Sequence, residues 1–180
     1  MTSLGYSVDR DITPNGKRIL YVAFYNAQGC GRCCQRFRHV ELRFSDGTVT
    51  SITKNPGVVH YDSSKIMRND NYSCFFKVFL DPQLEDWMQQ KARWYYDQQT
   101  LFARWGVFWN FICCCWPLRG DQTLFCSQYI TILLQIADMV PQLDPDCTSP
   151  TQLYTELKMC ENVMMGSNKR KERGNLVLHY

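Results

Sequence analysis

A cysteine at the expected start of an apolar helix is the residue of this chain best placed for nucleophilic chemistry. Cys126 opens the stretch CSQYITILLQI, whose apolar residues recur at helical spacing. The N-terminus of a helix carries unpaired N–H groups and a partial positive charge, and both stabilise a thiolate. A buried cysteine is also a common packing residue, so position alone leaves both interpretations open.

A thiol nucleophile needs a base, and the chain has three histidines. His179 is the penultimate residue, and His60 lies in a stretch without a clear pattern. His39 lies on the polar face of the alternating stretch Phe37–Phe44, which predicts a strand. A strand packed against the Cys126 helix would bring the two residues together, because such partners are adjacent in space rather than in sequence. An ordinary surface histidine on a strand is the alternative.

The elements that must position these residues follow the order strands first, helices afterwards. β-Branched and aromatic residues, alternation and turn signals predict strands over Lys17–Asn26, Phe37–Phe44, Thr48–Thr53 and Tyr72–Leu80. Capping and proline signals predict helices that start at Pro82, at Cys126 (about four turns, ending before Pro141) and at Pro150. This pattern predicts an α+β fold with a small antiparallel sheet packed against the cysteine-bearing helix.

The amino-acid composition indicates the class of protein. A hydrophobic fraction of 45% and an aromatic fraction of 14% indicate a folded globular chain. We expect a single domain over residues 1–165 and a basic tail over 166–180 whose last residues, NLVLHY, are compatible with a short strand. The net charge of +3 is mild, and no specific nucleic-acid partner is expected. A polar start and ten cysteines without a secretory signal predict reduced thiols and a cytoplasmic location.

The clustered cysteines raise a rival interpretation. Cys30, Cys33 and Cys34 form a CxxCC motif, and Cys113–Cys115 could supply further thiolates to a zinc ion. A contiguous run cannot easily place alternate thiolates on one tetrahedron, so we expect no metal and no cofactor. The CCC run can instead belong to the core or to an acylated contact with a membrane surface.

The order of several short motifs resembles a known family. The stretches HVELRFSDG, WYYDQQ, FCSQYI and SPTQLYTEL occur in the order typical of the circularly permuted branch of the NlpC-type papain-like superfamily. That branch includes lecithin-retinol-acyltransferase-like proteins, bacterial permuted amidases and poxvirus relatives, and in it the histidine strand precedes the cysteine helix. The matching positions, within residues 17–160, are His39, Asp46-Gly47, Tyr96-Asp97, Cys126-Ser127 and Ser149-Pro150.

The resemblance implies a permuted papain-like fold in which Cys126 is the nucleophile and His39 its base. The third polar position usually lies on the following strand, often as an acid, and here that strand offers Ser51 or Thr53. A hydroxyl can orient an imidazole but does not stabilise an imidazolium as a carboxylate does. Glu41 could substitute, although its distance along the strand, ~6.6 Å, is awkward for a direct contact.

The expected activity is that of a thiol hydrolase or acyltransferase acting on an amide or ester through an acyl-enzyme. Tyr96 would help to stabilise an oxyanion, and the apolar stretch with Trp105, Trp109 and Trp116 could bind an acyl chain. For a viral member the location would be the host cytoplasm, with contact to a membrane surface. The alternatives are a binding protein on the same fold with a degraded triad, and a zinc-stapled interaction module.

Overall fold

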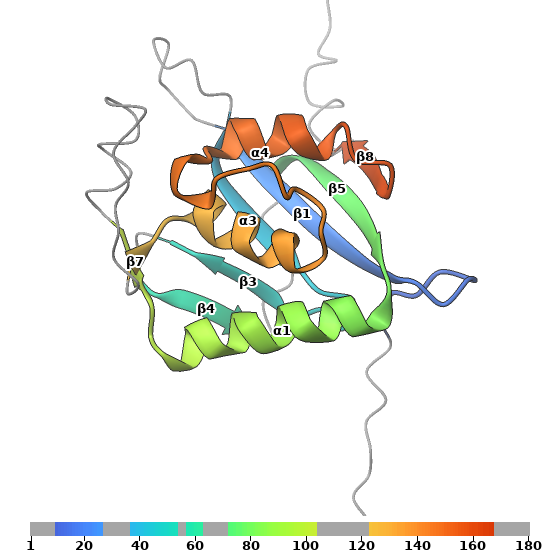
Figure 1. Cartoon of the computed structure of the whole chain (residues 1–180), viewed down its shortest axis with the longest axis horizontal. Coiled ribbons are helices and arrows are strands. Elements are labelled where there is room, and N and C mark those ends of the chain that lie inside the picture. The colour runs from blue at the N-terminus through green and yellow to red at the C-terminus, as the bar shows by residue number, and fades with distance from the viewer. Residues whose placement is uncertain (1–9, 27–36, 54–56, 63–71, 104–122, 168–180) are drawn as a thin grey trace, which may run out of the picture.

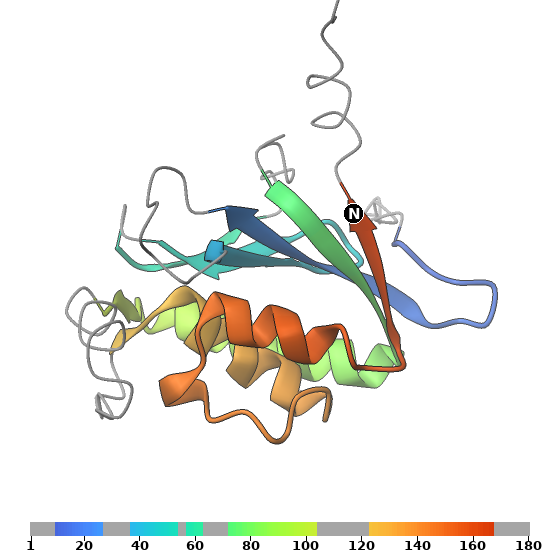
Figure 2. The ribbon, with the colours of Figure 1, turned by 90° about the horizontal axis from the view of Figure 1, so that it is seen from above.

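The structure, a computed structural model, describes residues 10–26, 37–53, 57–62, 72–103 and 123–167. One antiparallel sheet has the strand order β4-β3-β2-β1-β5-β8, and three helices of the described chain lie on one of its faces (Figures 1 and 2). The strands are β1 (Arg18–Asn26), β2 (Phe37–Arg43), β3 (Val49–Ile52), β4 (Val59–Asp62), β5 (Tyr72–Leu80) and β8 (Val163–Ser167). The helices are α1 (Pro82–Asp97), α3 (Cys126–Ile136) and α4 (Pro150–Leu157). The fold is therefore α+β, as the pattern predicts.

The four predicted strands form, and the sheet gains one strand at each edge. β4 pairs with β3 along its whole length, from Val49 opposite Asp62 to Ile52 opposite Val59. β8 pairs with β5 and continues to Ser167, past the predicted end of the domain at residue 165. A separate parallel pair, β6 (Leu101–Phe102) with β7 (Thr123–Leu124), leads directly into α3.

The core lies between the sheet and the helices. Alternate residues of β1 and β2 face it, with Val22 opposite Leu42 and Phe24 opposite Val40, all fully buried. Tyr154 of α4 packs its ring 5.6 Å from that of Phe24. From His39 to Arg43 the burial of β2 alternates, with Val40 and Leu42 fully buried and the polar residues between them partly exposed, so the alternation predicted for this part of the strand is confirmed.

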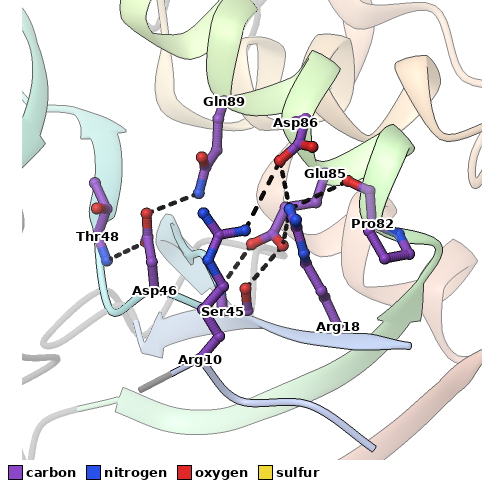
Figure 3. Close-up of polar contacts among 9 residues, drawn as sticks. All are labelled: Arg10, Arg18, Ser45, Asp46, Thr48, Pro82, Glu85, Asp86 and Gln89. Atoms are coloured by element: carbon purple, nitrogen blue, oxygen red, sulfur yellow. Dashed lines mark hydrogen bonds and ion pairs between the residues drawn. The ribbon is translucent and has the colours of Figure 1, made fainter. Parts of the chain in front are cut away.

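A buried carboxylate ties α1 to the sheet (Figure 3). Glu85 is fully buried and accepts hydrogen bonds from the backbone N–H of Ser45 at 2.6 Å and from its hydroxyl at 2.8 Å. Arg18 of β1 lies 3.2 Å from the same carboxylate and also pairs with Asp86. A buried charge is tolerated when it is paired and hydrogen-bonded in this way. The contacts fix the first turns of α1 against β1 and the β2–β3 turn.

α3 lies between α1 and α4 and packs on β2 and β3 (Figure 1). It has 11 residues and is shorter than the four turns predicted. It ends early because Asp138 adopts a left-handed backbone conformation with φ 54°, and the N–H of Met139 bonds back to Leu134. Within the described ranges, no helix combines the length and the apolar character that crossing a membrane requires.

Candidate active site

The N-terminus of α3 presents Cys126 as its first helical residue. The preceding N-cap residue, Phe125, has no side-chain oxygen with which to cap the first N–H groups. α4 differs, because the hydroxyl of its N-cap Ser149 accepts a hydrogen bond from the N–H of Gln152 at 3.2 Å. The first N–H groups of α3 are therefore left without a capping hydroxyl beside the Cys126 side chain, which is 6% exposed.

Two contacts brace this end of the helix. Tyr129, one turn after Cys126, is fully buried, and its hydroxyl lies 2.7 Å from that of Thr50 on β3. The hydroxyl of Ser127 donates to the carbonyl of Thr148 at 2.6 Å. Together they hold the thiol at a set position between the sheet and the segment that leads into α4.

His39 of β2 interacts with the thiol of Cys126 and with the carboxylate of Glu41. It lies outside the β2–β3 ladder, which pairs Leu42 and Arg43 of β2. Burial lowers the pKa of the imidazole, but the interactions with the thiol and the carboxylate outweigh burial and raise the pKa to about 9. The imidazolium is therefore the favoured form at neutral pH, opposite a thiol at a helix N-terminus.

Glu41 holds a ring nitrogen of His39. The Nε2 atom of His39 lies 3.2 Å from Oε1 of Glu41, and the two side chains are 20% and 19% exposed. The side chains bridge the ~6.6 Å of strand between them, so the spacing that argued against this contact does not prevent it. Burial raises the pKa of Glu41, yet hydrogen bonds from His39 and Tyr25 bring the pKa below its usual value.

The structure corrects the assignment of Ser51 as the partner of His39. Ser51 is fully buried in β3, and its hydroxyl donates to the carbonyl of Val40 at 2.7 Å. The hydrogen bond that orients the imidazole runs from a ring N–H of His39 to an acceptor, and Nε2 of His39 contacts Oε1 of Glu41 instead. Thr53, the other predicted hydroxyl, follows β3, where its carbonyl accepts a hydrogen bond from the N–H of Gly57 at 3.1 Å. Glu41 takes the place expected for these hydroxyls.

Tyr96 is the one residue predicted to bind substrate that lies within the described ranges. Tyr96 lies exposed on the last turn of α1, with its ring 6.5 Å from that of Tyr61 on β4, and the contacts of the described residues do not join it to Cys126. In the described part of the chain no cluster of His, Cys, Asp and Glu is arranged to hold a metal ion. Several predicted residues lie outside the described ranges: Trp105, Trp109, Trp116, Cys30, Cys33, Cys34 and Cys113–Cys115.

Two residues near the site were missed by reasoning from the sequence. Tyr25 of β1 donates from its hydroxyl to Oε2 of Glu41 at 2.5 Å. His60 of β4 is buried, and its electrostatic interaction with Glu41 is a further contribution to the lowered pKa of that carboxyl. Tyr25 lies in a predicted strand, but ten residues separate β1 from β2, and a connection of that length does not specify which residues of the two strands pair. His60 lies in a four-residue strand too short for a clear periodic pattern.

No family model, curated protein or solved structure matches this chain. The interpretation of the site therefore depends on its own geometry and chemistry.

Proposed function

We propose that this protein is a cysteine-dependent hydrolase or acyltransferase that cleaves an amide or ester bond through an acyl-enzyme. One observation carries the proposal: His39 interacts with the thiol of Cys126 and also with the carboxylate of Glu41. A nucleophile, a base and a group that orients the base are the parts that covalent catalysis by a thiol requires. A packing cysteine would not need a charged imidazole beside it.

The acylation step follows from these positions. The Cys126 sulfur attacks the carbonyl carbon, and the oxyanion that forms accepts hydrogen bonds from N–H groups at the start of α3. Because Nε2 of His39 contacts Glu41, Nδ1 is the nitrogen that we assign to proton transfer. The imidazolium protonates the departing amine or alkoxide, the C–N or C–O bond breaks, and a thioester remains on Cys126.

Deacylation uses the same groups in reverse. Water, or the hydroxyl or amine of an acceptor, gives a proton to His39 and attacks the thioester carbonyl. The Cys126 thiolate leaves, and the ion pair with the imidazolium is restored. Glu41 stabilises this positive charge, which a hydroxyl such as that of Ser51 would not do.

The resemblance to the circularly permuted papain-like branch supports the same interpretation. In that branch a strand carrying the histidine precedes a helix that starts with the cysteine, and β2 and α3 of this chain have that order. Glu41 is a departure, since it lies on the histidine strand rather than on the next one. The acyl-chain site at Trp105, Trp109 and Trp116, the cytoplasmic location and the contact with a membrane surface remain predictions of the sequence.

Covalent labelling and turnover test the proposal together. Because Cys126 is 6% exposed, the first probe should be small, such as iodoacetamide, followed by a p-nitrophenyl ester whose hydrolysis reports acylation. We expect Cys126→Ala to abolish ester turnover and the fast labelling. Cys160→Ala is the matched control, because that thiol contacts the carbonyl of Met139 and burial raises its pKa.

The opposite result would favour the alternative of a binding protein. If the purified chain neither forms a covalent adduct at Cys126 nor turns over activated esters between pH 6 and 9, the proposed catalysis is wrong. Turnover that persists in Cys126→Ala would place the chemistry elsewhere.

A further inference from the structure

Tyr25 occupies an unusual place beside the candidate site. It lies on β1 directly opposite His39 of β2, and it is 8% exposed. The β1–β2 ladder shifts its register between Tyr25 and Asn26. Such irregularities re-aim side chains and are common next to active sites. Tyr25 therefore faces the imidazole from a neighbouring strand, at the point where the regular ladder ends.

Tyr25 makes two contacts with the histidine–carboxylate pair. Its hydroxyl donates to Oε2 of Glu41 at 2.5 Å, while Oε1 of the same carboxylate lies 3.2 Å from Nε2 of His39. Its ring lies 5.4 Å from the imidazole ring, centroid to centroid, at an interplanar angle of 40°. Each carboxylate oxygen thus has its own partner, and hydrogen bonds to a charged acceptor are stronger than neutral ones.

A glutamate side chain has several rotatable bonds, and holding it in one rotamer costs conformational entropy. Glu41 is 19% exposed, so water competes with His39 for its carboxylate. We infer that Tyr25 is a positioning residue, which holds the Glu41 carboxylate toward His39 and supports the imidazole from the adjacent strand. This inference rests on the proposed function, because the position of His39 matters for catalysis only if His39 serves Cys126.

The test compares two Tyr→Phe variants of the same strand. Tyr25→Phe removes the hydroxyl that contacts Glu41 and keeps the ring. Tyr21→Phe is the matched control: Tyr21 lies four residues earlier on the same face of β1, with its ring 5.9 Å from that of Phe75. The titration midpoint of His39 is followed by ¹⁵N NMR of its ring nitrogens, and the alkylation rate of Cys126 is measured over the same pH range.

We expect Tyr25→Phe to lower the His39 midpoint from about 9 by roughly one pH unit, a tenfold change in the protonation equilibrium. The pH profile of Cys126 alkylation should move with it, and Tyr21→Phe should change neither. A purely structural role would lower the melting temperature and leave both midpoints in place. A folded Tyr25→Phe variant with unchanged midpoints overturns the inference.

A second variant keeps the inference testable if Tyr25→Phe does not fold. In Glu41→Gln the Tyr25 hydroxyl loses its charged acceptor, so the ¹³Cζ resonance of Tyr25 should shift, while that of Tyr21 should not. An unchanged Tyr25 resonance would overturn the inference. If Cys126 is unreactive in the wild-type chain while these NMR signals respond as expected, the proposed function fails and the positioning of Glu41 by Tyr25 stands.

Discussion

Replacing Glu41 by glutamine removes the negative charge beside His39 and keeps the length and shape of the side chain. The pKa of His39 is raised from 6.5 to about 9, which corresponds to about 3 kcal/mol in favour of the imidazolium. Cys126 and Glu41 share this effect against the opposing effect of burial. Loss of the Glu41 charge should therefore lower the pKa of His39 by on the order of one pH unit, or about 1.4 kcal/mol.

NMR titration of the His39 ring nitrogens measures this change directly. The rate of esterase turnover against pH gives an independent reading, because the limb that reports His39 should move to lower pH by the same amount. Glu161→Gln is a suitable control, since it makes the same substitution at an exposed carboxylate after α4. Circular dichroism checks that both variants keep the fold.

A His39 midpoint that stays within a few tenths of a pH unit of the wild-type value in Glu41→Gln would contradict this role of the carboxylate. An equal shift in Glu161→Gln would contradict it too, because the effect would then reflect overall charge. A rise in the midpoint would mean that the carboxylate at 3.2 Å from Nε2 does not stabilise the imidazolium.

Three further predictions concern stability and the corrected third residue. Glu85→Ala should lower the free energy of unfolding in urea by about 2–6 kcal/mol, at about 1–3 kcal/mol for each buried donor left unsatisfied, because the backbone N–H and the hydroxyl of Ser45 lose their acceptor. Asp86→Ala, at a carboxylate 56% exposed, should cost less than ~1 kcal/mol. Because the pKa of His39 is raised from 6.5 to about 9 in the fold, the stabilisation by its imidazolium is fully present below pH 6.5 and is lost as the pH rises through about 9. The free energy of unfolding of the wild-type chain should therefore fall by up to about 3 kcal/mol across that window. The fall should be smaller in His39→Ala. Ser51→Ala should cost ~1–3 kcal/mol of stability, because the carbonyl of Val40 loses the hydrogen bond from the serine hydroxyl. The pH profile of Cys126 alkylation should stay unchanged. A shifted profile would mean that Ser51 does interact with His39.

The strands and helix starts could be predicted because local signals specify them. Alternation placed His39 on the polar face of β2, and proline at the first helical position marked the starts of α1 and α4. The C-terminal end of α3 could not be predicted from the sequence, because the helix ends at the left-handed backbone of Asp138 and not at Pro141. β4 was missed because four residues are too few to establish a period.

The candidate site was predictable only in part, for a physical reason. Cys126 and His39 could be paired from residue type, element and order along the chain. The choice between Ser51 and Glu41 depended on side-chain direction and on which backbone carbonyl the serine reaches. The contact of Tyr25 with Glu41 depended on the pairing register of β1 with β2 and on the shift of that register after Tyr25. Sequence spacing specifies neither the register nor the shift.

The central claim is that Cys126 and His39 form a reactive pair, and alkylation mapped by mass spectrometry against pH tests it most directly. Iodoacetamide should modify Cys126 before the other cysteines and well below pH 8, and His39→Ala should move that reactivity to higher pH. If Cys147 or Cys160 reacts first, or if His39→Ala leaves the Cys126 profile unmoved, the pair does not act as proposed.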